Sequence, residues 1–322
     1  MIFLHRTLGL AFFAVAAGGA SSALAQVFPG KPVRMVVGFG TGGGTDTLSR
    51  VLSRKLADIW PQPLVVENRP GADGSIATEI VAKSAADGYT LVMVSNAHAI
   101  TPFQRKLAYD AVKDFAPVTL LGSNPNLLLL HPALPVKNLT ELLALAKSRP
   151  NELAFASSGT GTSPYLAMEL LKSITGMKLT HVPYKGSGPA VIDLTGGHVQ
   201  LMFGAVSTTL NYLQSGRLRA IAISSPQRWP ALPGIPTVAE SGVPGFEAST
   251  WYGVLAPAGT SQTIVSKLHS DMVTAITAPD IRKLVMELGI STIANSPREF
   301  SDVIRSDMAR WGKLIRSLNQ PG

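Results

Sequence analysis

A glycine-rich stretch near the start of the chain decides the fold: residues 38–46 read Gly38-Phe39-Gly40-Thr41-Gly42-Gly43-Gly44-Thr45-Asp46. An apolar run at 33–37 precedes it, and apolar residues at helical spacing follow from Leu48 to Trp60. This order predicts a strand, a loop and a helix, with Thr45 or Asp46 as the N-cap. The unpaired N–H groups and the dipole of that helix start would suit an anion such as a carboxylate or a phosphate.

The same loop contains a formal G-x-G-x-x-G at Gly38, Gly40 and Gly43, and Glu67 follows a second apolar run. This pattern is also found in dinucleotide-binding folds. Three glycines in a glycine-rich loop are a weak match, and the N-terminus described below argues against a dinucleotide enzyme. A glycine turn without any ligand is the other alternative.

The first 25 residues have the features of a signal peptide. His5 and Arg6 precede an apolar stretch at 8–17, and small residues end in Ala23-Leu24-Ala25 before Gln26. The apolar stretch is shorter than the roughly 20 residues that span a bilayer. We therefore expect cleavage near Ala25/Gln26 and an exported, soluble mature protein.

Composition narrows the class of protein further. The chain of 322 residues has no cysteine, which excludes disulfides, thiol chemistry and a lipid anchor on cysteine. Charged residues are 15% and hydrophobic residues 46%, as in a compact globular protein, and the mature length suggests two domains. The net charge of +8 is scattered, without a basic run that would indicate nucleic acid, and it favours anionic solutes.

A second loop of the same physical kind lies in the other half of the chain. It reads Ser157-Ser158-Gly159-Thr160-Gly161-Thr162-Ser163, follows an apolar run at 153–156, and opens a helix at Pro164. Two helix starts that face each other across a cleft would hold an anion between them. This pairing is a stronger signal than either loop alone.

The order of strands, loops and helices predicts parallel sheets, whose ligands gather at the carboxyl ends of the strands. The strand at 90–94 ends in Ser95-Asn96-Ala97-His98, so we expect this loop and 38–46 to share one edge. His98 could bond a ligand carboxylate or satisfy loop carbonyls. Residues 117–132 and 251–255 are predicted to cross between the domains.

Several motifs together resemble the Bug family, the extracytoplasmic receptors of tripartite tricarboxylate transporters. The resemblance runs from about Lys31 to Trp311. It is carried by the stretches at 37–46, 66–72, 87–91, 113–118, 157–163, 181–186 and 251–260. It implies an α/β fold of the two-domain periplasmic binding protein type II class, with the ligand cleft between domains joined by two crossing segments. The first domain would comprise 26–125 and 250–322, and the second 126–249.

The resemblance also implies a site. In this family the two small-residue loops hold a carboxylate, which corresponds here to Thr41, Gly42, Gly43, Gly44, Thr45, Asp46, Ser157, Ser158, Gly159, Thr160, Gly161 and Thr162. The side chains expected to select among acids are Phe39, Thr41, Ser95, His98, Tyr184 and Ser207. We expect a periplasmic monomer that passes a small organic carboxylate, a di- or tricarboxylate or an aromatic acid, to the membrane subunits of a tripartite tricarboxylate transporter, with no cofactor, no metal and no nucleic acid.

The chain departs from the family pattern at two places. Gly38, Gly40 and Thr41 stand where prolines are frequent in the first loop, which predicts a more flexible loop. Gly204 stands where many members carry an acidic residue, and its absence argues for a plain carboxylate over an amino acid.

Two other functions fit parts of the sequence. A sensor that presents the same acid to a membrane kinase would share every feature above. An exported hydrolase would need an activated nucleophile, and the sequence has neither a G-x-S-x-G elbow nor an S-x-x-K motif at a helix start. The identity of the acid does not follow from backbone contacts to its carboxylate.

Overall fold

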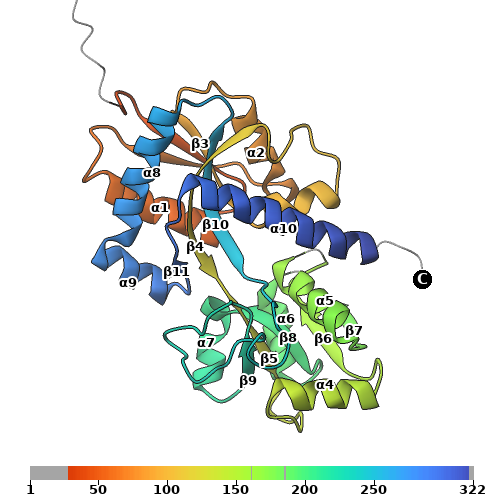
Figure 1. Cartoon of the computed structure of the whole chain (residues 1–322). Helices are drawn as coiled ribbons and strands as arrows, with labels where there is room; N and C mark the ends of the chain where they lie inside the picture. Colours follow the sequence, from red (N-terminus) through yellow and green to blue (C-terminus); the bar gives the residue numbers. More distant parts are fainter. Residues whose placement is uncertain (1–27, 161, 185, 319–322) are drawn as a thin grey trace, which may run out of the picture.

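The computed structural model describes residues 28–160, 162–184 and 186–318, apart from the side chain of Ser207 (Figure 1). The chain forms two α/β domains, each built on its own sheet, and helix α10 (Pro297–Leu318) runs alongside both domains. None of the described helices is long and apolar enough to cross a membrane.

The sheet of the first domain is mixed, where the sequence predicted a parallel one. Its strand order is β11-β4-β10-β3-β1-β2. The parallel part consists of β1 (Val33–Val37), β2 (Leu64–Asn68) and β3 (Thr90–Ser95). The antiparallel part consists of β10 (Thr250–Pro257), β4 (Phe115–Asn124) and β11 (Ser291–Thr292). Its longer helices are α1 (Gly44–Leu56), α2 (Ser75–Ala82), α8 (Gln262–Thr277) and α9 (Pro279–Glu287).

The second domain repeats this plan on a smaller sheet of order β7-β6-β8-β5-β9. Strands β6 (Ala154–Ser157), β7 (Thr180–Pro183) and β8 (Leu201–Ala205) are parallel. Strand β5 (Asn126–Leu130) runs antiparallel to β8 and to β9 (Arg219–Ile223). The helices are α4 (Leu139–Ser148), α5 (Ser163–Thr175), α6 (Ser187–Thr195) and α7 (Val206–Gln214).

The chain passes between the domains as a nearly continuous β-ribbon. Strand β4 belongs to the first sheet and β5 to the second, with Pro125 between them, so the first predicted crossing is confirmed. The second prediction is wrong by a few residues, because Trp251–Leu255 lies inside β10 of the first sheet. The return crossing comes just before it, where the N–H of Ala248 still donates to the Ser224 carbonyl of the second domain.

The capping residues that the sequence suggests are confirmed at two helix starts and are wrong at a third. Asn138 caps α4, because its side-chain oxygen accepts the Glu141 N–H at 2.9 Å. At the start of α10 the Glu299 N–H donates to the Ser296 hydroxyl, and the Ser296 N–H donates back to the Glu299 carboxylate at 2.8 Å. Neither Thr45 nor Asp46 caps α1, since the helix begins at Gly44 with Gly43 as its N-cap.

Helix α10 packs against the cores of both domains. Phe300 and Ile304 lie in a buried cluster of the first domain. About two and three turns beyond Ile304, Trp311 and Ile315 pack in the cluster that contains Phe155 of the second domain. The C-terminal helix is therefore a further physical link between the domains, alongside the two crossings.

Candidate ligand-binding site

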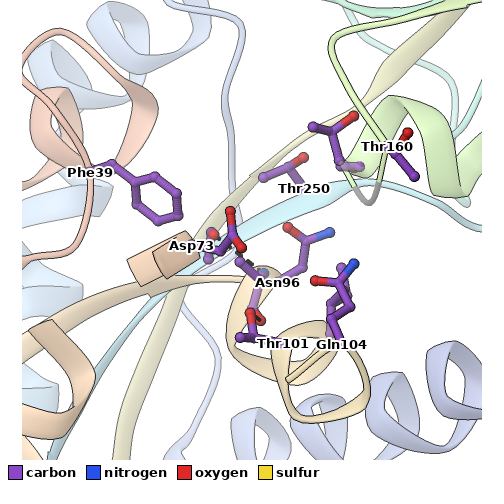
Figure 2. A pocket seen from close by; sticks show the side chains of 12 residues that line it. Phe39, Asp73, Asn96, Thr101, Gln104, Thr160 and Thr250 are labelled. Carbon is purple, nitrogen blue, oxygen red and sulfur yellow. Dashed lines mark hydrogen bonds between the residues drawn. The ribbon is translucent and has the colours of Figure 1, made fainter. Parts of the chain in front are cut away.

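A cavity of about 230 Å³ lies between the two domains. The first domain contributes the ends of β1 and β3, the start of β10, the short helix α3 (Ala97–Ile100) and the turns η1 (Ala72–Gly74) and η2 (Thr101–Phe103). The second contributes the loop between β6 and α5. The lining residues are Phe39, Asp73, Ser95, Asn96, Ala97, Ile100, Thr101, Gln104, Thr160, Thr162, Ser163 and Thr250. Figure 2 shows Phe39 and Thr160 on opposite sides, with Asp73 and Asn96 between them.

The second-domain wall is the uncapped start of α5. Thr162 occupies the N-cap position, but its hydroxyl donates to the Gly159 carbonyl at 2.7 Å, and none of the described side chains caps the helix. Pro164 has no N–H to satisfy, so the N–H groups of Ser163 and Tyr165 are the ones without an intrahelical acceptor. Together with the positive end of the dipole, they favour an anion at this wall.

The first-domain wall carries a buried amide without a protein partner. Asn96 is 3% exposed, and its side-chain nitrogen has no hydrogen-bond partner among the described residues. A buried donor of this kind costs free energy unless something accepts its hydrogen bond. Because Asn96 lines the cavity, a ligand oxygen can satisfy it. Ser95 lies beside it, and its hydroxyl accepts the Ala97 N–H at 3.4 Å.

The glycine loop contributes Phe39 alone to this cavity. Thr41, Gly42 and Gly43 are exposed to solvent outside it. Gly44 packs against the Tyr252 hydroxyl so closely that a β-carbon would lie 2.3 Å from it, and Thr45 is buried. The prediction that this loop forms one arm of a two-helix grip is therefore not met by the cavity that the structure shows.

Asp46 braces the loop from inside. Its carboxylate accepts the Gly42 N–H at 2.9 Å and bonds from Arg50 and Asn68. Burial alone would raise the pKa of this carboxyl, but the bonds from Arg50, Gly42 and Asn68 outweigh it and lower the pKa. The side chain is 2% exposed and fully engaged, so its role is to hold the loop and not to contact a ligand in this cavity.

For His98 the sequence left open a ligand contact or a bond to a loop carbonyl; the side chain does not line this cavity, and it bonds a loop carbonyl. The Nε2 atom lies 2.7 Å from the Ala111 carbonyl and so carries the proton that it donates. The ring is 4% exposed and packs edge-on against Phe115. Burial lowers its pKa to about 4, which keeps the imidazole neutral. His98 holds the segment around Ala111 in place.

Two further predicted residues also serve the structure of the second domain. Ser157 has no exposed surface, and its hydroxyl oxygen lies 2.7 Å from His181 Nε2. This is a serine–histidine pair, but no substrate can reach the serine. Tyr184 donates its hydroxyl to Asp193 at 2.6 Å and does not line the cavity.

The remaining predicted positions divide three ways. Thr160 and Thr162 line the cavity, and so do Phe39 and Ser95. Ser158 donates to Thr162 at 3.2 Å, and Gly159 makes the turn between them at φ +133°. Gly161 and the side chain of Ser207 lie outside the part of the chain that the structure describes.

Gly204 does not bear on the cavity. It lies inside β8, where a β-carbon would meet Thr209 at 2.9 Å and Leu129 at 3.0 Å. The lack of an acidic side chain at Gly204 therefore gives no information on which ligand this cavity binds. The carboxylate that lines the cavity comes from another place, Asp73 in η1, and it forms an ion pair with Arg105.

The family profile described as "Tripartite tricarboxylate transporter family receptor" (TctC) matches residues 48–320. The chain belongs to this receptor family. It is thus a receptor and not an enzyme, and the resemblance to Bug receptors is confirmed by relatives that carry that name.

Relatives of this TctC receptor match over nearly their whole length. Protein BugT of Bordetella pertussis is 37% identical over 310 residues, which cover 95% of each chain. An R. palustris protein solved with adipate is 36% identical with a TM-score of 0.76, covering 90% of this chain and 97% of that one. A TctC solute-binding protein from Polaromonas, solved without ligand, is 27% identical with a TM-score of 0.83, covering 90% and 99%. These likenesses confirm the two-domain type II fold.

Eight of the twelve lining residues of this TctC receptor were missed from the sequence, among them Asn96 and Asp73. Asn96 lies in the predicted loop between two residues that were chosen, Ser95 and His98. Its position directly after β3 was the available signal. Asp73 lies in the turn-rich stretch after β2, and only the fold brings that stretch to the end of β3.

Proposed function

We propose that this receptor captures a small organic carboxylate in the cavity between its domains and delivers it to the membrane subunits of a tripartite transporter. The observation that carries the proposal is the pairing of the partnerless Asn96 amide with the uncapped start of α5 in one cavity. One wall offers backbone N–H groups and a positive dipole, and the other offers a buried N–H donor. A carboxylate has an oxygen for each.

The relatives agree with this chemistry. One structural neighbour is described with adipate and another, an R. palustris protein called MatC, with malate. We further propose a monomer exported to the periplasm after cleavage near Ala25/Gln26. Its domains would be 26–125 with 250–322, and 126–249, closing by a hinge around the crossings.

The experiment is a thermal-shift screen of refolded mature protein against carboxylates, amino acids and nucleotides, because refolding removes any ligand retained from purification. A ligand at 100 times its dissociation constant stabilises by about 2.7 kcal/mol, which raises the melting temperature by roughly 4–5 °C at this size. Stabilisation by a class of carboxylates supports the proposal. Stabilisation by nucleotides alone, or by nothing tested, would overturn it.

A substitution at Asn96 links binding to this cavity. Asn96→Ala removes the buried amide, and the loss of a hydrogen bond to a charged oxygen should weaken binding about 10- to 100-fold. Asn211→Ala, on the exposed surface of α7 outside the cavity, is the matched control and should bind as the wild type does. Equal affinities of all three proteins in calorimetry would place the ligand elsewhere.

A further inference from the structure

The cavity has an unusual charge for a receptor of acids. Among the described residues that line it, Asp73 is the one with a formal charge, and that charge is negative. The others are neutral: threonines, serines, amides, alanine, isoleucine and Phe39. An acid with a carboxylate at each end would find a favourable wall at the start of α5 and an opposing carboxylate near Asp73.

The backbone conformation at Asp73 indicates a functional role for its side chain. Its φ and ψ are 56° and 34°, the left-handed region that glycine adopts without strain. Ala72 beside it has φ of 48°, and Gly71 and Gly74 also have positive φ, so the whole turn is left-handed. A side chain at such a position costs stability, and residues held this way concentrate at functional sites. Figure 2 shows the Asp73 carboxylate directed between Phe39 and Asn96.

The ion pair with Arg105 leaves the carboxylate available. The side chains of Asp73 and Arg105 are 54% and 43% exposed, so water screens their attraction. Arg105 itself lines a neighbouring cavity of about 340 Å³, which shares Asp73, Gln104 and Thr160 with the first. Asp73 therefore stands between the two cavities, with one side toward the ligand and the other toward Arg105.

We propose that Asp73 is a specificity residue that selects monocarboxylates with an N–H donor at the far end, an ammonium or a primary amide, over dicarboxylates. The inference rests on the proposed function, because the start of α5 and Asn96 hold the carboxylate end. Asp73 accepts a hydrogen bond from the far end of the ligand. It repels a second carboxylate at the same place, which is discrimination by an unfavourable contact.

The test uses a matched set of acids that differ only at the far end: adipate, its monoamide, ω-aminohexanoate and hexanoate, each also at neighbouring chain lengths. Calorimetry on refolded wild type should give tighter binding of ω-aminohexanoate and of the monoamide than of adipate, by about tenfold or more. Asp73→Asn keeps the shape and removes the charge, so the preference for the ammonium over adipate should shrink at least severalfold.

Two further variants separate specificity from folding. Asp73→Gly suits the left-handed backbone, so it should fold at least as well as the wild type and lose the same preference. Arg105→Gln leaves the carboxylate unpaired and should increase the preference for the ammonium.

The outcomes distinguish the two proposals. Adipate binding wild type as tightly as ω-aminohexanoate, or an unchanged ratio in Asp73→Asn, would overturn the role of Asp73 and leave the carboxylate receptor standing. So would tight adipate binding that disappears in Arg105→Gln, because the arginine would then hold the second carboxylate. Binding of none of these acids to folded wild type would overturn the proposed function and this inference together.

Discussion

His98 is a neutral imidazole enclosed in the first domain. Because burial lowers its folded pKa to about 4, the unfolded chain with its ordinary value near 6.5 takes up a proton first as the pH falls. The stabilisation is complete above about pH 6.5 and is lost progressively between there and pH 4. At pH 4 the free energy of unfolding should be lower than at neutral pH by on the order of 2–3 kcal/mol.

Urea unfolding between neutral pH and pH 4.5 measures this effect. His98→Gln, whose amide can still donate to the Ala111 carbonyl, should show a flatter decline of the unfolding free energy on acidification than the wild type. His198→Gln is the control, since His198 is exposed. Parallel declines in wild type and His98→Gln would show that His98 does not carry this pH dependence.

A second prediction at this scale concerns Asp307 of α10, which is 3% exposed. It accepts the Trp251 indole N–H at 2.7 Å and pairs with Arg310, which donates to the Glu247 carbonyl at 2.7 Å. Asp307→Ala leaves the buried Trp251 indole N–H unpaired and removes one partner of Arg310, which keeps the Glu247 carbonyl, so it should destabilise the protein by about 1–3 kcal/mol. Asp302→Ala, exposed on the same helix, should change stability by less than about 0.5 kcal/mol. Similar denaturant midpoints for both variants would contradict this account.

Among the elements, the turn η1 rests directly on the end of β1. A β-carbon at Gly38 would lie 2.4 Å from the Gly74 Cα, whereas one at Gly40 would meet nothing within 4 Å. Gly38→Ala should therefore displace the turn that carries Asp73, destabilise by about 1–3 kcal/mol and weaken ligand binding. Gly40→Ala should leave both properties near wild type. Chemical denaturation and calorimetry compare the two variants. A Gly38→Ala variant with wild-type stability and wild-type ligand affinity would contradict the close packing of Gly38 on Gly74.

Local patterns predicted most of these elements, because each strand, helix and cap is encoded within a few residues. The capping pairs at Asn138 and Ser296 and the strand–glycine–helix order are of this kind. The direction of β10 and β4 depends on pairing across more than a hundred residues of sequence, which no local pattern contains. The mixed character of the first sheet was missed for that reason.

The candidate site was predicted less completely, since burial decides whether a polar residue binds or braces. Thr160, Thr162, Phe39 and Ser95 lie at the cavity as their loops suggested. His98 and Asp46 have equally suitable chemistry, but their partners are supplied by the Ala111 segment and by Asn68. Those partners become visible only in three dimensions.

For the whole molecule, we predict that the two domains close on a bound carboxylate. The crossings and α10 connect the two domains, and Ile100 of the first domain lies in the buried cluster of the second together with Trp311 of α10. A ligand held by both walls of the cavity favours the closed form by the difference of its affinities for the two forms. When the domains close, helix α10 must change its contacts with one of them. We expect strain in its second half, which packs on the second domain.

The chain is well suited to the decisive measurement, because it contains no cysteine. Spin labels on Ile76→Cys of α2 and Ile174→Cys of α5, at positions that are 46% and 50% exposed, place one probe on each domain. Pulsed electron resonance should show the distance distribution move to shorter values when the tightest-binding carboxylate saturates the refolded protein. The same labels in Asn96→Ala should need far more ligand for that change. An unchanged distribution at saturation confirmed by calorimetry would contradict capture of the acid between the domains.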